Sequence, residues 1–187
     1  MKVIIAAAAC LAAALSPVRS ETPTLQDLTV AVEGDRYVAS CRLNGGLTPE
    51  ILEEIDAGLE TTIGYRFQLI RVRHGLPDET ILKSRVRCAV RFDALTKQYT
   101  LTRRIDGEVQ DTRVTPDAQV MRGFLTAVHR LPLAAVSDLQ PDQEYYLRAK
   151  ADIGLVWRFY LIPWPFDTDW ARVPVLPKDG GADHAAP

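Results

Sequence analysis

Residues 163–174, PWPFDTDWARVP, combine large aromatic rings with two aspartates separated by one threonine. Asp167 and Asp169 have the chemistry of a catalytic carboxylate pair or of metal ligands. The same residue types also form turns, because short oxygen side chains accept hydrogen bonds from nearby backbone amides. The prolines disfavour a central strand. We expect a turn that packs the rings against the domain; the alternative is a partly exposed anchor for a partner or an acyl chain. The aromatic candidates are Trp164, Phe166 and Trp170.

A second group of candidate residues is basic. Residues 66–104 contain ten Lys or Arg and three acids, although the whole chain has 22 Lys and Arg against 24 Asp and Glu. Much of this charge alternates along expected strands and should form a ribbon on one sheet face. Such a ribbon attracts anionic lipid headgroups, lipopolysaccharide or an acidic protein. The alternative is a solvated face whose arginines guard strand edges. The partner-binding candidates are Arg71, Arg73, Arg85, Arg87 and Arg91.

Two cysteines, Cys41 and Cys88, remain after the N-terminal leader described below. An even pair in an exported protein is compatible with a disulfide and with two buried thiols that act as small apolar side chains, and the sequence does not show whether the Cα atoms are within bridging distance. Neither cysteine belongs to an activating CxxC motif, so we do not expect a catalytic thiol.

Other catalytic signatures are missing from the sequence. The three histidines (His74, His129 and His184) form no HExxH motif and no zinc-like spacing, so we predict neither a metal nor a cofactor. Ser40, Ser84 and Ser137 lie outside any G-x-S-x-G turn. We therefore expect that the protein is not an enzyme. A hydrolase whose carboxylates meet only in the folded chain is the lowest-ranked alternative.

Antiparallel strands must position these candidates. Apolar and polar residues alternate over 28–33 and 36–43 around Gly34-Asp35, and over 99–105 and 108–114 around Asp106-Gly107, which predicts two hairpins. Residues 65–74, 80–92, 145–153 and 155–162 are further strands, the last ended by Pro163. The predicted fold is α+β: seven to eight antiparallel strands, in a sandwich or a curved sheet, with two amphipathic helices.

Both helices have sequence start signals. Thr48-Pro49 opens a helix with an apolar stripe of Ile51, Ile55, Leu59 and Ile63, and Gly64 ends it. Thr115-Pro116-Asp117 opens the second helix in the same manner. Its stripe is Val120, Phe124, Val128 and Leu131, with His129 in the last turn, and a loop follows over 133–139.

The N-terminal residues 1–20 resemble a secretory signal peptide. Lys2 precedes an apolar run, Val3 to Leu15, and cleavage is expected before Glu21. Lipidation at Cys10 is disfavoured because only Val3 to Ala9 would precede it. We predict a periplasmic protein with one β-rich domain over 21–176, no transmembrane segment after cleavage, and a disordered tail over 177–187. Export also disfavours nucleic acid as a partner.

Taken in order, these features resemble an exported proteobacterial domain-of-unknown-function family of the DUF4390 type. The resemblance rests on a first helix that leads into YRF at 65–67, on LTKQYTL at 95–101, and on LPL at 131–133. YYLRAKAD at 145–152 and a closing proline-aromatic segment with Trp170 complete it. The family's usual pattern lacks cysteines at positions like 41 and 88, so a disulfide would be a local feature.

The resemblance implies a component of the cell envelope, whose gene often lies beside that of a membrane-bound sensor histidine kinase. It implies no active-site residue in this chain. We therefore expect a non-enzymatic domain that binds an envelope protein, with a periplasmic lipid or small-ligand carrier as the alternative.

Overall fold

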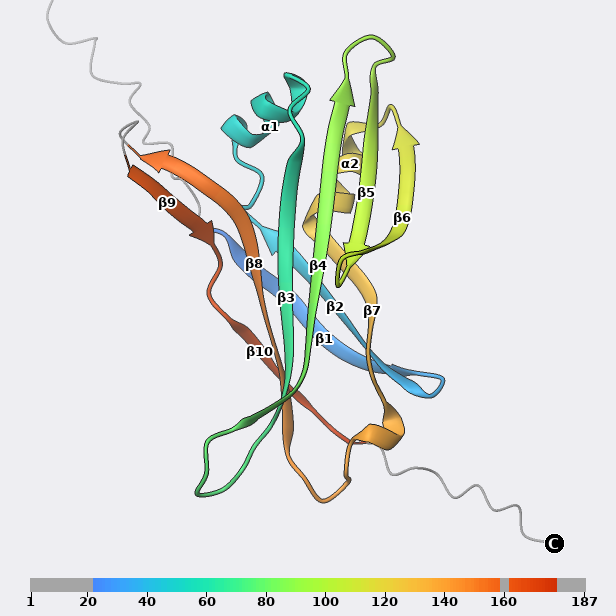
Figure 1. The fold of residues 1–187 in the computed structure, drawn as a ribbon, viewed down its shortest axis with the longest axis vertical. Helices are drawn as coiled ribbons and strands as arrows, with labels where there is room; N and C mark the ends of the chain where they lie inside the picture. Colours follow the sequence, from blue (N-terminus) through green and yellow to red (C-terminus); the bar gives the residue numbers. More distant parts are fainter. Residues whose placement is uncertain (1–21, 159–161, 178–187) are drawn as a thin grey trace, which may run out of the picture.

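Two antiparallel sheets make up most of the computed structural model, which describes residues 22–158 and 162–177 (Figure 1). The small sheet has the order β1-β2-β7. The large sheet has the order β10-β8-β3-β4-β5-β6, and β9 pairs with the far half of β8. The strands are β1 (Thr24–Glu33), β2 (Arg36–Asn44), β3 (Thr61–Arg71), β4 (Glu79–Asp93), β5 (Gln98–Ile105), β6 (Glu108–Thr115), β7 (Ala127–Ala135), β8 (Tyr145–Arg158), β9 (Ile162–Asp167) and β10 (Ala171–Val175).

The core lies between the two sheets, since the small sheet crosses one face of the large one (Figure 1). Tyr37, Ala39 and Cys41 of β2 belong to the same buried cluster as Tyr65 and Phe67 of β3. Helices α1 (Pro49–Asp56) and α2 (Ala118–Thr126) add Ile51, Ile55, Met121, Phe124 and Leu125 to it. The sheets do not close into a barrel. The predicted fold, mainly antiparallel β with two helices, is confirmed.

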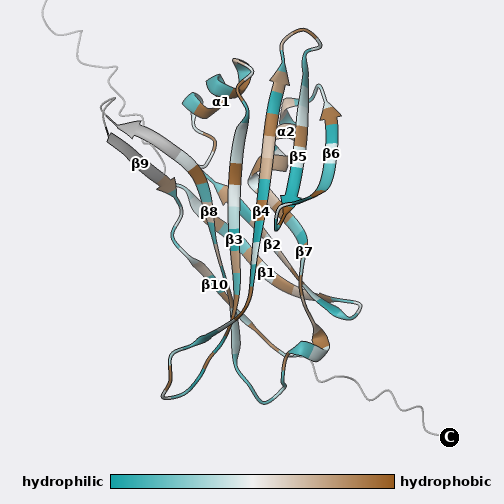
Figure 2. Cartoon of the chain, viewed as in Figure 1, coloured by the Kyte–Doolittle hydropathy of each residue, from teal (hydrophilic) through white to brown (hydrophobic). Residues whose placement is uncertain are grey.

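Strand β4 shows the predicted alternation. Val86, Cys88 and Val90 are buried, whereas Arg85, Arg87 and Arg91 are exposed on the opposite face. Figure 2 shows the corresponding change of hydropathy along the strands of the large sheet. The hairpin at Asp106-Gly107 is also confirmed: both residues have positive φ angles, 51° and 96°, as a tight two-residue turn requires.

The first helix is shorter than predicted. Thr48 caps it as expected, its Oγ1 accepting from the Ile51 amide at 3.4 Å, but the helix ends at Asp56. Leu59 lies exposed in the following loop, and Ile63 belongs to β3. Ile63 also fits the two-residue period of Tyr65, Phe67 and Leu69. Pairing with Cys88 of β4 places it in the sheet, which outweighs the helical spacing.

The second helix was also predicted too long. It starts at Ala118, capped by Asp117 rather than Thr115, and ends at Thr126. Val128 and Leu131 lie on β7 and pair with Cys41 and Ala39 of β2, so the stripe continues into a strand. His129 lies on β7 too, exposed. The predicted loop over 133–139 is instead the end of β7 and a short 3₁₀ helix, Val136–Asp138.

The C-terminal end of α2 is held by two side chains from the large sheet. The buried Tyr65 hydroxyl donates to the Leu125 carbonyl at 2.6 Å. Arg103 donates to the carbonyls of Phe124 and Ala127 at 3.3 and 3.2 Å. These bonds satisfy carbonyls that a helix end leaves unpaired, and the guanidinium suits the negative end of the helix dipole.

Strand β8 is longer than predicted. Antiparallel β9 pairs with its far half, so Pro163 and Pro165 lie within a strand that, among the described residues, pairs with β8 alone. Prolines are tolerated in such an edge strand because no neighbour needs their amides. The predicted signal peptide and almost all of the predicted tail lie outside the described residues. No helix of residues 22–158 and 162–177 is both long enough and apolar enough to cross a bilayer.

Candidate partner-binding face

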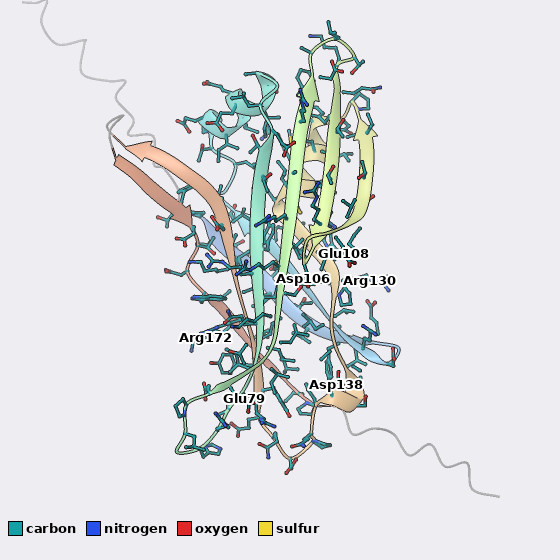
Figure 3. All side chains as sticks on the ribbon, in the orientation of Figure 1. Glu79, Asp106, Glu108, Arg130, Asp138 and Arg172 are labelled. Atoms are coloured by element: carbon teal, nitrogen blue, oxygen red, sulfur yellow. The ribbon has the colours of Figure 1, made fainter. Side chains whose placement is uncertain are left out.

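The side of the large sheet that faces away from the core carries a group of basic side chains, here called the outer basic face. The alternation along β3, β4, β5, β8 and β10 directs them there. The members are Arg66, Lys83, Arg85, Arg87, Arg91, Arg104, Arg148, Lys150 and Arg172. Figure 3 shows this side of the molecule, with Arg172 labelled near β10.

Several of these residues lie directly opposite one another on neighbouring strands. Arg66 pairs in register with Arg85 on one side and Lys150 on the other. Arg87 lies opposite Arg104, and Arg148 opposite Arg172. Like charges at directly opposite positions destabilise a sheet, by up to about 1 kcal/mol per pair. The fold therefore tolerates a concentration of charge that the sheet itself does not need.

Few of these charges are neutralised by the described part of the chain. Lys150 pairs with Asp167, and Arg66 lies 3.8 Å from Asp152. The other seven members form no ion pair with a described carboxylate. The outer basic face therefore presents free positive charge to solvent.

Trp170 belongs to this face as well. Its ring centroid lies 4.6 Å from the guanidinium carbon of Arg148 and 5.9 Å from the Lys150 ammonium. The residue is half-buried and stands just before β10. The structure thus brings one predicted aromatic candidate onto the same surface as the predicted basic candidates Arg85, Arg87 and Arg91.

The other two predicted arginines lie elsewhere. Arg71, at the end of β3, bonds Glu79 at 2.5 Å, and Arg73 lies 3.7 Å from the same carboxylate. Figure 3 shows Glu79 at the end of the sheet where the β3–β4 loop begins. The hydrogen bond from Arg71 lowers the pKa of Glu79. Arg71 and Arg73 therefore hold the two ends of the β3–β4 loop together through Glu79. They do not belong to the outer basic face.

The Asp167-Thr168-Asp169 segment is not the predicted turn: it links β9 to β10, which both run antiparallel to β8, opposite residues 152–158 and 145–149. Thr168 is buried; its amide donates to the Ala151 carbonyl at 2.9 Å, and its Oγ1 accepts from the Ala151 amide at 2.9 Å. Asp167 binds Lys150, and Asp169 is exposed. Phe166 packs against the core. Trp164 lies on β9, but its side chain is outside the described part of the structure. The segment thus fastens β9 and Trp170 to β8.

Cys41 and Cys88 are free, buried thiols in this structure, on β2 and β4 of the two facing sheets. Burial raises the pKa of Cys41 from 9.0 to about 12 and also raises that of Cys88. Such thiols are poor nucleophiles at neutral pH, because the thiolate is the reactive form. The alternative of two buried thiols matches this arrangement, and the disulfide stays a prediction for the exported protein.

Within the described residues, no three His, Cys, Asp or Glu side chains gather as a metal site would require. A hollow of about 150 Å³ lies between β1 and β10, lined by Val30, Val32, Tyr37, Val175 and others. Ligand pockets usually measure about 300 Å³ or more. This hollow is too small for a lipid, and none of the residues that line it is a member of the outer basic face.

The candidates from the sequence leave out six members of the outer basic face: Arg66, Lys83, Arg104, Arg148, Lys150 and Arg172. A signal existed for three of them, because the alternation over 80–92 places Lys83 on the side of Arg85, and that over 145–153 places Arg148 and Lys150 on one side of a strand. The missing information was strand order. Strand β8 lies beside β3, from which it is separated by four strands in the sequence.

The comparisons with known proteins give one family. A family model described as a domain of unknown function, DUF4390, matches residues 20–156. This range includes every member of the outer basic face except Arg172, and it ends before Phe166 and Trp170. No curated protein and no solved structure matches the chain.

Proposed function

Because the chain belongs to the DUF4390 family, whose description names no function, we propose a role from its surface: an exported, non-enzymatic envelope domain that binds an acidic protein partner through the outer basic face. Export rests on the signal-like residues 1–20. The binding role rests on the unpaired like charges of the face.

The single observation that carries the proposal is the set of four cross-strand basic pairs: Arg66 with Arg85, Arg66 with Lys150, Arg87 with Arg104, and Arg148 with Arg172. Repulsion within such pairs costs folding free energy. Proteins retain destabilising surface residues where function needs them. An anionic partner would offset the repulsion and would meet a complementary surface.

A protein partner fits this surface better than a lipid ligand. The side chains stand on a continuous sheet face rather than around a cavity, and the small hollow at β1 and β10 is lined by none of them. Among the large exposed apolar residues, Leu59, Leu76 and Leu95 lie in loops. Others lie beside the basic residues: Val109 of β6 is directly opposite Arg104, and Ile81 of β4 is two residues before Lys83. A membrane-binding surface usually carries a wider apolar side with Leu, Phe and Trp.

The partner we favour is the outward-facing part of a membrane sensor or of another envelope assembly, following the family resemblance.

The test is crosslinking in intact cells, with mass spectrometry that maps the crosslinked residues of both proteins. The variant Arg85→Glu/Arg87→Glu reverses two charges of the face. Arg42→Glu, on the exposed side of β2, is the matched control for a charge change elsewhere.

We expect one envelope protein, crosslinked through an acidic segment, to be captured by the wild type and by Arg42→Glu and lost in the double variant. Failure to capture any specific protein would refute the proposal. Equal capture by the wild type and the double variant would show that another surface binds.

A further inference from the structure

We propose that Arg148 and Arg172 are the anchor of this interface and that each binds a carboxylate of an extended acidic segment of the partner. The inference rests on the proposed function and adds which residues set its specificity. Arg148 and Arg172 lie directly opposite each other on β8 and β10. Unlike Arg85, Arg87 and Arg104, each has an aromatic ring against its guanidinium, and Arg148 also donates hydrogen bonds.

Arg148 is fixed on two sides. The Trp170 ring lies against its guanidinium at 4.6 Å, and the Gln68 Oε1 accepts from its Nε at 2.9 Å and from one terminal nitrogen at 2.6 Å. A guanidinium has five N–H donors, and Gln68 uses two of them. The other donors lie in the plane of the group, where a carboxylate binds with two parallel hydrogen bonds.

Arg172 is held in a similar way. Its guanidinium carbon lies 5.6 Å from the ring centroid of Tyr146, and the Tyr146 hydroxyl is itself held by Asp78 at 3.1 Å. Arg172 forms no ion pair with a described carboxylate. The two arginines therefore form a pair of guanidinium groups, each backed by a ring.

Fixed side chains bind more tightly, because less rotational freedom is lost when the partner orders them at the interface. Arg, Trp and Tyr are also the residues that most often dominate interface energies. Arg85, Arg87 and Arg104 have no ring contact in the described structure. We assign them to long-range attraction of the partner, which depends on charge and not on geometry.

The occupant follows from charge and spacing. Side chains directly opposite on neighbouring strands are about 5 Å apart at Cβ, and alternate residues of an extended peptide are about 7 Å apart. Two acidic residues separated by one residue can therefore reach Arg148 and Arg172 together. A segment with Asp or Glu at every second position would meet these two arginines and then the rest of the face.

The test measures binding of synthetic peptides to the purified mature protein by fluorescence anisotropy. The probe carries glutamate at every second position, and the same peptide with glutamine is its control. Arg148→Lys keeps the charge and removes a guanidinium at the anchor. Arg87→Lys makes the same change outside the anchor. Trp170→Leu keeps every charge and removes the ring behind Arg148. Circular dichroism confirms that each variant is folded.

We expect Arg148→Lys and Trp170→Leu to weaken peptide binding about tenfold, and Arg87→Lys to weaken it by less than about twofold. Equal effects of Arg148→Lys and Arg87→Lys would overturn the anchor. Tighter binding of polyphosphate or of anionic vesicles than of the glutamate peptide would overturn the assigned occupant. Neither result contradicts the proposed function. The proposed function itself is refuted if crosslinking in cells captures no partner.

Discussion

Arg87 on β4 lies directly opposite Arg104 on β5, and neither guanidinium forms an ion pair with a described carboxylate. Each residue thus stands in the field of the other on an exposed sheet face. The arrangement links folding stability to partner binding, because any change that relieves the repulsion also removes charge that an acidic partner would use.

Arg104→Glu should therefore stabilise the isolated domain by about 0.5 kcal/mol at low ionic strength, since it replaces a repulsive cross-strand pair with an attractive one. Urea unfolding at low and high salt measures this. Salt should stabilise the wild type more than the variant, because it screens the repulsion. Arg91→Glu is the control, as Arg91 lies opposite the uncharged Thr100. A less stable Arg104→Glu protein at low salt would contradict the prediction.

Thr168→Val should destabilise the domain by about 1–3 kcal/mol, because it leaves the buried Ala151 amide without its acceptor at 2.9 Å. Valine keeps the shape and nearly the volume of threonine, so packing changes little. Thr100→Val, on the exposed side of β5, is the matched control and should stay within about 0.5 kcal/mol of the wild type. Similar unfolding midpoints for the two variants would show that the link between β9 and β10 does not depend on this bond.

The fold was predictable wherever one pattern dominated a segment. The alternation on β4 and the Asp106-Gly107 turn both appear in the structure as expected. The helix lengths were wrong because Ile63 and Val128 fit two periods at once. Only the pairing of Ile63 with β4 and of Val128 with β2 decides which period applies, and strand pairing between distant segments is not visible in one sequence.

The candidate site was predictable residue by residue but not as an assembly. The sequence indicated basic residues on β4 and aromatic rings near the C-terminus as separate hypotheses. The structure joins Arg85 and Trp170 on one face, because β8 inserts beside β3 and the hydrogen bonds of Thr168 fasten the link between β9 and β10 to β8. It separates Arg71 and Arg73 from that face by pairing them with Glu79. Local pattern does not determine such neighbours.

The two core cysteines predict that stability falls in alkali. Burial raises the pKa of Cys41 from 9.0 to about 12 and raises that of Cys88. Above pH 9 the unfolded chain loses thiol protons that the folded chain keeps, so the free energy of unfolding decreases as pH rises from 9 toward 12. At pH 10 the loss should be about 1 kcal/mol for Cys41.

Urea unfolding of the wild type and of Cys41→Ala, each at pH 7 and pH 10, measures this loss. The variant should lose less stability between the two pH values than the wild type, even if it is less stable at both. Thiol counting in denaturant without reductant is the control, because the effect requires two free cysteines. A pair of thiols that stays unreactive there would instead support the predicted disulfide, and the alkaline loss should then disappear.

Tyr65→Phe should lower the free energy of unfolding by about 1–2 kcal/mol, because the Leu125 carbonyl at the end of α2 loses the buried donor that lies 2.6 Å away. The ring itself stays, so the packing between β3 and α2 is retained. Tyr99→Phe is the matched control: Tyr99 is also buried but makes no hydrogen bond with a described residue, so its variant should be close to neutral. If both substitutions cost the same, the hydroxyl of Tyr65 does not hold the helix end. If only Tyr65→Phe is destabilising, the point where the predicted long helix becomes strand β7 is fixed by a contact from a strand 60 residues earlier in the sequence.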